Sequence, residues 1–162
     1  MPRLFTGLEI PEPIRTRLSL IRSPLAGARW VAAENMHITL RFVGDIDDRT
    51  ADEFADLLAD VRGKPFAVTI GGVGAFGGRD PRVLWAGVEA GEPLAALYRA
   101  NERAARAAGL EPDARAFRPH VTLARMRSAR ALSAISQALL SSAWAEASGA
   151  GGLVPFTDGR AL

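Results

Sequence analysis

The chain has 162 residues, 48% of them hydrophobic and 23% charged, and it contains no cysteine. These values are typical of a soluble globular protein, and they exclude disulfides and thiolate metal sites. The pI is about 9.9 although the net charge is only +2, because arginine dominates the basic residues and keeps its charge at any accessible pH. The overall charge therefore supports only a weak, nonspecific attraction to nucleic acid.

The N-terminal residues MPRLFTGLEIPEP carry a charge at position 9 and prolines at positions 11 and 13. This pattern is too interrupted for the apolar core of a signal peptide. No apolar run in the sequence is long enough to cross a membrane. We therefore expect a cytoplasmic protein that makes no membrane contact.

Strands and helices alternate along the first half of the chain. The pattern predicts a strand at Leu4–Ile10, a helix at Glu12–Ile21, a strand within Trp30–Val43 and a helix at Asp47–Val61. The last of these helices is amphipathic, and Asp47 or Asp48 is its expected N-cap.

The second half continues in the same way. The expected elements are strands at Phe66–Ile70 and Val83–Val88, a helix at Leu94–Ala108 closed by Gly109, a strand at Ala116–Met126 and a helix at Ala131–Trp144. The segment GGVGAFGGRDP lacks the lysine of a phosphate-binding loop and no helix follows it, so it is expected to connect two strands. No linker divides the chain, so residues 1–162 are expected to form one domain, with residues 149–162 as a loose tail or an edge strand.

A short motif occurs twice. ENMHITLRF and FRPHVTLAR both contain His-(Ile/Val)-Thr-Leu, and the two histidines, His37 and His120, lie 83 residues apart, about half the chain length. A helix precedes each motif strand and another follows it. This duplication predicts an α+β fold of two similar lobes, in which antiparallel sheets face each other across a central cleft.

Side chains alternate across a strand, so each motif separates an apolar face from a polar one. In the first motif His37, Thr39 and Arg41 share one face, and the other face is apolar, with Met36, Ile38, Leu40 and Phe42. In the second motif His120 and Thr122 point away from the core. The chain has only two histidines, and both hold the same place in the same motif, which favours function over chance.

Two facing histidines can act as an acid–base pair. Histidine titrates near neutral pH, so one copy can remove a proton from water while the other protonates a leaving oxygen, as hydrolysis of a phosphodiester requires. The hydroxyls of Thr39 and Thr122 can donate to phosphate oxygens. Arg41 and Arg125 can offset the phosphate charge. The sequence holds no cluster of histidines or cysteines for a metal, so none is expected.

The chain resembles the two-histidine (2H) phosphoesterase superfamily, and within it the RNA 2′,3′-cyclic phosphodiesterases, also called 2′-5′ RNA ligases. The resemblance covers roughly residues 3–127 and depends on LFTGLEIPEPIR, RWVAAENMHITLRFVGD, RVLWAGV and FRPHVTLAR. It implies a bilobal fold that opens a terminal 2′,3′-cyclic phosphate to a 2′-phosphomonoester without a cofactor. It also implies that His37 is the proton donor, His120 the proton acceptor, Thr39 and Thr122 phosphate ligands, and Arg125 a substrate contact.

Geometry and resemblance disagree about the arginines. Strict alternation places Arg125 on the face opposite His120, so it needs a twist, a bulge or a position at the rim to reach substrate. Arg41 has the better face but less support from the family.

The substrate is expected to be an RNA end or a cyclic nucleotide, and the protein a monomer. Action on a small cyclic nucleotide or a 2′-5′ linkage, including reversible ligation, and a non-catalytic RNA-binding module remain alternatives.

Overall fold

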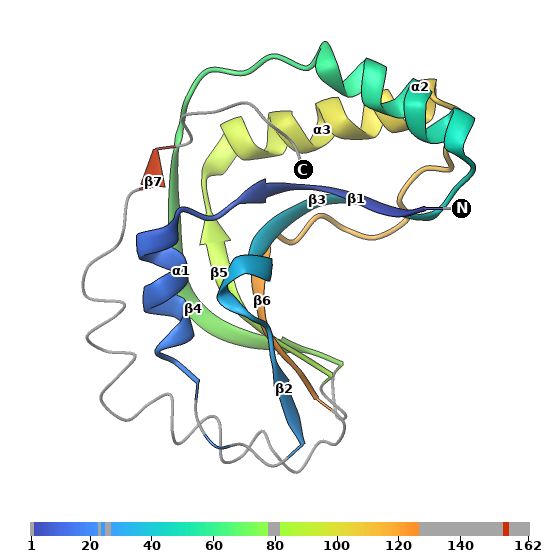
Figure 1. The fold of residues 1–162 in the computed structure, drawn as a ribbon. Coiled ribbons are helices and arrows are strands. Elements are labelled where there is room, and N and C mark those ends of the chain that lie inside the picture. The colour runs from blue at the N-terminus through green and yellow to red at the C-terminus, as the bar shows by residue number, and fades with distance from the viewer. Residues whose placement is uncertain (1, 23, 25–26, 78–81, 127–153, 156–162) are drawn as a thin grey trace.

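The structure is a computed structural model, and it describes residues 2–22, 24, 27–77, 82–126 and 154–155 (Figure 1). In chain order the elements are β1 (Arg3–Glu9), α1 (Glu12–Ser19), β2 (Ala28–Trp30), the 3-10 turn η1 (Ala33–Asn35), β3 (His37–Asp45), α2 (Asp48–Ala59), β4 (Ala67–Phe76), β5 (Val83–Glu89), α3 (Gly91–Ala107), β6 (His120–Met126) and β7 (Val154–Pro155).

The strands of the described residues form one seven-stranded sheet in the order β1-β3-β6-β5-β4-β7, with β2 also paired to β6. Every strand pair is antiparallel, which confirms the expected α+β class. Figure 1 shows the sheet as a strongly curved surface, with α2 and α3 side by side above β1 and β3. None of the described helices is long and apolar enough to span a membrane.

The two halves of the sheet meet at one pair of residues, Ile38 of β3 and Val121 of β6. These residues are 83 positions apart, as are the two histidines, so they occupy the same place in the two motifs. A local twofold axis therefore passes between them. Both are buried, at 2% and 0% exposure, and strand alternation turns the residues on either side of each toward the opposite face of the sheet.

Helix α2 begins as its sequence predicts. The Asp47 carboxylate accepts hydrogen bonds from the Thr50 N–H (2.9 Å) and hydroxyl (2.8 Å), and these bonds lower the pKa of Asp47. Phe54 of α2 packs on small residues of α3, with Ala104 and Ala105 among them. Alanine lets the helix backbones approach closely, so the two helices cover the sheet as one layer.

Several expected elements have different bounds. The strand expected within residues 30–43 is two strands, β2 and β3, separated by η1. The strand expected at residues 66–70 continues to Phe76, because the glycine-rich residues that follow keep pairing with β5. The strand expected from Ala116 begins only at His120, after a loop. In the tail, β7 is an edge strand paired with Ala67 and Val68, while the helix expected at residues 131–144 lies outside the described residues.

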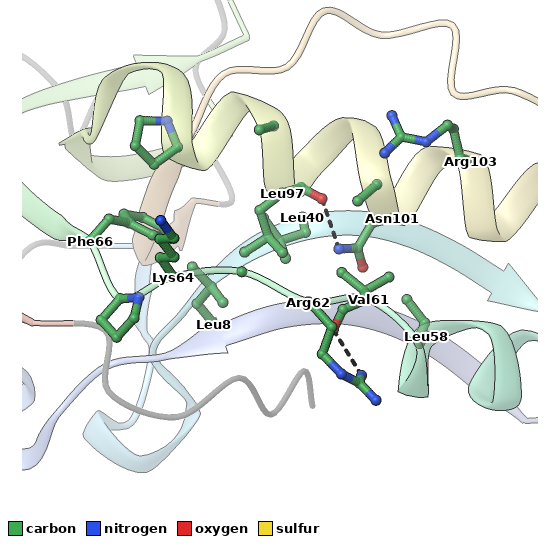
Figure 2. Close-up of a pocket in the computed structure, with 15 residues that line it drawn as sticks. Leu8, Leu40, Leu58, Val61, Arg62, Lys64, Phe66, Leu97, Asn101 and Arg103 are labelled. Atoms are coloured by element: carbon green, nitrogen blue, oxygen red, sulfur yellow. Dashed lines mark hydrogen bonds between the residues drawn. The ribbon is translucent and has the colours of Figure 1, made fainter.

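An apolar cavity of about 340 Å³ lies between α3 and the connection from α2 to β4 (Figure 2). Its walls include Leu8, Leu40 and Phe66, and Asn101 contributes a buried amide whose Nδ2 donates to the Leu97 carbonyl over 3.0 Å. Leu8 and Leu40 belong to the core. This cavity therefore lies on the core side of the motif strands, away from both histidines.

Gly7 permits the close approach of β1 to β3. A Cβ atom at this buried position would lie only 2.8 Å from the backbone oxygen of Ile38. We expect Gly7→Ala to lower the free energy of unfolding by about 1–3 kcal/mol, because backbone cannot move aside as a side chain can. Gly63→Ala is the matched control, since nothing lies within 4 Å of the added atom, and it should change stability by less than about 0.5 kcal/mol. Urea unfolding measures both, and equal losses would contradict the steric argument.

Candidate active site

Both histidines are held by the backbone two residues before them. His37 Nδ1 lies 2.8 Å from the Asn35 carbonyl oxygen, and His120 Nδ1 lies 2.6 Å from the Arg118 carbonyl oxygen. A carbonyl oxygen only accepts hydrogen bonds, so Nδ1 must carry the proton in each ring. This tautomer leaves Nε2 of both neutral imidazoles free to accept a proton.

The register of β3 and β6 arranges the four motif side chains as a rectangle. Because Ile38 pairs with Val121 in antiparallel register, the strands place His37 opposite Thr122 and Thr39 opposite His120. Directly opposite Cβ atoms in such a ladder are about 5 Å apart, and diagonal neighbours are about 7–8 Å apart. The histidines therefore occupy diagonal corners with the threonines between them, a spacing that can bracket one phosphate group.

A β-bulge follows the second motif. The register with β5 shifts so that Leu123 has no partner, and Leu123 and Ala124 are both fully buried. Alternation then resumes in the opposite phase, and Arg125 is exposed and lines the same cavity as His120. A bulge is one of the routes by which the sequence predicted that Arg125 could reach substrate.

The same bulge occurs in the first motif and overturns the predicted positions of two residues. The register with β1 shifts at Leu40, and Leu40 and Arg41 are both buried. Phe42, expected in the core, is 38% exposed and lines the cavity. Arg41, expected on the same face as His37, is instead turned inward and forms ion pairs with Glu102 and Asp113. The prediction that Arg41 shares the exposed face of His37 is therefore wrong.

A cavity of about 560 Å³ opens between the two motifs. Four predicted site residues line it: Thr39, His120, Thr122 and Arg125. Sequence reasoning missed other residues of its wall, among them Phe42, Tyr98, Arg115, Phe117 and Arg118. His37 is not part of this lining. Its ring stacks on Phe5 with centroids 4.5 Å apart, and its proximity to the cavity follows from its place beside Thr39 on β3.

The environment of His120 favours its neutral form. Burial is the main cause of a lowered pKa at His120, and the Coulomb interaction with His37 lowers it further, while the bond to the Arg118 carbonyl acts in the opposite direction. The Phe76 ring contacts His120 edge-on, with centroids 4.9 Å apart. A neutral imidazole with a free Nε2 is suited to accept a proton from water.

Among the residues that the structure describes, no three His, Cys, Asp or Glu side chains gather where they could hold a metal ion. The groups that line the cavity, an imidazole, threonine hydroxyls and guanidinium groups, together with His37 next to Thr39, can supply acid–base chemistry and charge stabilisation.

A family model described as LigT-like phosphoesterase matches residues 8–85 and 87–147. The chain belongs to this family. It is 39% identical to an RNA 2′,3′-cyclic phosphodiesterase of Aeropyrum pernix over 129 residues, covering 76% of this chain and 73% of that protein. A Thermotoga maritima protein of the same name is 37% identical over 134 residues, covering 77% and 70%.

Solved structures of LigT-like phosphoesterases have the same fold. Escherichia coli LigT in complex with 3′-AMP superposes with a TM-score of 0.67 at 30% identity, covering 76% of this chain and 72% of that one. The family resemblance inferred from the two motifs is therefore confirmed.

The lowered pKa of His120 can be measured by NMR titration, because the chain has only two histidines. In the wild-type protein His120 should titrate below the ordinary value of about 6.5. Phe76→Ala should raise this pKa toward the ordinary value, since it lets water reach the imidazole. His37→Ala identifies the His120 signal, and Phe5→Ala, which removes the ring stacked on His37, is the matched control. A wild-type pKa at or above the ordinary value would refute the burial argument.

Proposed function

We propose that this LigT-like phosphoesterase hydrolyses the terminal 2′,3′-cyclic phosphate of RNA to a 2′-phosphomonoester without a metal ion. The observation that carries the proposal is the diagonal pair of histidines, oriented alike by backbone carbonyls. Relatives named RNA 2′,3′-cyclic phosphodiesterase support it, as does the 3′-AMP complex of Escherichia coli LigT. The expectations of a single domain over residues 1–162, a monomer and a cytoplasmic location remain part of this proposal.

In the proposed reaction His120 is the general base. Its Nε2 takes a proton from water as the water oxygen attacks phosphorus, in line with the bond to the 3′ oxygen. His37, entering the cycle as an imidazolium, gives its Nε2 proton to the departing 3′ oxygen. The P–O3′ bond breaks, a P–O bond to the water oxygen forms, and the products are a 2′-phosphomonoester and a 3′-hydroxyl. The lowered pKa of His120 supports its role as the base.

The pentavalent transition state concentrates negative charge on the nonbridging oxygens of the phosphate. Thr39 and Thr122 hydroxyls can donate hydrogen bonds to these oxygens from the remaining corners of the rectangle. Arg125, brought to the cavity by the bulge, can offset the charge. Each histidine then acts on a different side of one phosphorus atom.

The direct test is incubation of the protein with an oligoribonucleotide that ends in a 2′,3′-cyclic phosphate, in excess EDTA. We expect conversion to the 2′-phosphomonoester at an unchanged rate, because no step uses a metal. A 2′,3′-cyclic mononucleotide and a 2′-5′-linked dinucleotide in parallel distinguish the alternative substrates. Loss of activity in EDTA that a divalent ion restores would contradict the mechanism.

Substitution separates the roles of the two histidines. His37→Ala and His120→Ala should each lower turnover of cyclic-ended RNA by at least roughly 100-fold, the scale of general acid–base catalysis. An activated nitrophenyl phosphodiester needs almost no protonation of its leaving group, so it should partly rescue His37→Ala. His120→Ala should stay inactive on that substrate, because the attacking water still lacks its base.

Circular dichroism of both variants is the control for folding. Rescue of His120→Ala instead of His37→Ala would reverse the two roles. Equal loss on both substrates would mean that the histidines act mainly by binding phosphate.

A further inference from the structure

The loop between α3 and β6, residues 108–119, forms one wall of the active-site cavity. Asp113, Arg115, Phe117 and Arg118 of this loop all line the cavity. Phe117 stacks on Tyr98 of α3, with centroids 4.2 Å apart and planes 6° from parallel. This aromatic pair holds the loop against α3 at one point, and Arg41 contacts the loop at a second.

Arg41 makes this second set of contacts with the loop. Its Nη2 donates to the Glu111 carbonyl, its Nη1 lies 3.4 Å from Asp113 Oδ2, and its Nε lies 3.1 Å from Glu102 Oε2. Glu102 of α3 also accepts a 3.2 Å hydrogen bond from the Asp113 N–H. All three guanidinium nitrogens of Arg41 therefore contact the loop or α3, and the side chain is only 7% exposed.

Asp113, which Arg41 holds in place, in turn holds Arg115. The Asp113 carboxylate accepts hydrogen bonds from the Arg115 backbone N–H (3.1 Å), Nε (3.0 Å) and Nη2 (3.2 Å). These bonds lower the pKa of Asp113 and raise the pKa of Arg115. One carboxylate thus fixes both the backbone and the guanidinium plane of Arg115.

The held side chain of Arg115 is nevertheless open to solvent. It is 70% exposed, and its guanidinium carbon lies 5.8 Å from the centroid of the Phe42 ring. Asp113 occupies the Nε edge, and within the described residues no hydrogen bond involves Nη1. A guanidinium held in a fixed plane with free donors is well suited to bind phosphate oxygens.

We propose that Arg41 is a positioning residue that, through Asp113, holds Arg115 where it binds the phosphate next to the cyclic end of an RNA chain. The inference rests on the proposed function and adds a preference for a chain over a cyclic mononucleotide. The motif strands supply the ligands of the reacting phosphate, whereas Arg115 comes from the loop wall and faces a different part of the substrate. Arg118, exposed on the same wall, adds positive charge there.

The test is equilibrium binding of two products, a trinucleotide ending in a 2′-phosphate and the corresponding 2′-phosphate mononucleotide, at one fixed salt concentration. Arg115→Ala should weaken binding of the trinucleotide about tenfold relative to the mononucleotide, the scale of a charge-assisted contact. Arg106→Ala, which removes an exposed arginine of α3 outside the cavity lining, is the matched control and should leave the ratio unchanged. An unchanged ratio in Arg115→Ala would overturn the phosphate contact.

The positioning role is tested by Asp113→Asn, which keeps the side-chain size and removes the charge that holds Arg115. It should lower the ratio of trinucleotide affinity to mononucleotide affinity, as Arg115→Ala does. The double variant should show no further loss of this ratio. Arg41→Lys should change the ratio in the same direction, because a compact ammonium cannot contact all three oxygens. A merely structural role would lower Tm and leave the ratio intact.

Additive effects of Asp113→Asn and Arg115→Ala would overturn the positioning role. Binding of products does not depend on turnover, so this outcome is separate from a failure of the proposed hydrolysis. A wild-type protein that binds both products with the expected ratio and hydrolyses neither cyclic substrate would contradict the proposed function alone.

Discussion

The contact between Ile38 and Val121 is the constraint from which the rest of the site follows. It joins the two halves of the sheet, and each side chain contributes about 1.5–3 kcal/mol by its burial. Because the paired residues are equivalent in the two motifs, their register fixes the diagonal arrangement of His37 and His120. A slip of one residue on either strand would turn its histidine into the core, so the stability of the core also maintains the geometry of the site.

A symmetric scaffold here carries an asymmetric set of side chains. Both motif strands bulge at the leucine of His-x-Thr-Leu, yet the residue delivered to the cavity is Phe42 in one half and Arg125 in the other. The proposed reaction needs the same asymmetry, since in it one histidine accepts a proton and the other donates one. Burial beside Phe76 distinguishes His120 electrostatically, while His37 stacks on Phe5.

Backbone carbonyls hold both motif histidines, and the buried Arg41 cluster holds the loop that orients one of them. The Arg118 carbonyl orients His120 and belongs to the same loop that Arg41 binds through Glu111 and Asp113. Removing one partner of such a buried pair leaves an uncompensated charge, so the position of this wall depends on the whole cluster. One residue of the first motif thereby contributes to the surroundings of the histidine in the second.

The sequence by itself determined the α+β class, most elements and the repeated motif that carries the histidines and threonines, because periodicity, capping residues and a repeated motif are local signals. Only the tertiary structure decided which face of the sheet each side chain takes beyond the motif threonine. A bulge depends on how the neighbouring strand pairs, and β1 and β5 impose it from far away in the chain. For this reason Arg41 is buried and Arg125 exposed, the reverse of strict alternation. Arg115 is held by Asp113, which in turn contacts Arg41 and Glu102 from distant parts of the chain, so no local pattern marks it.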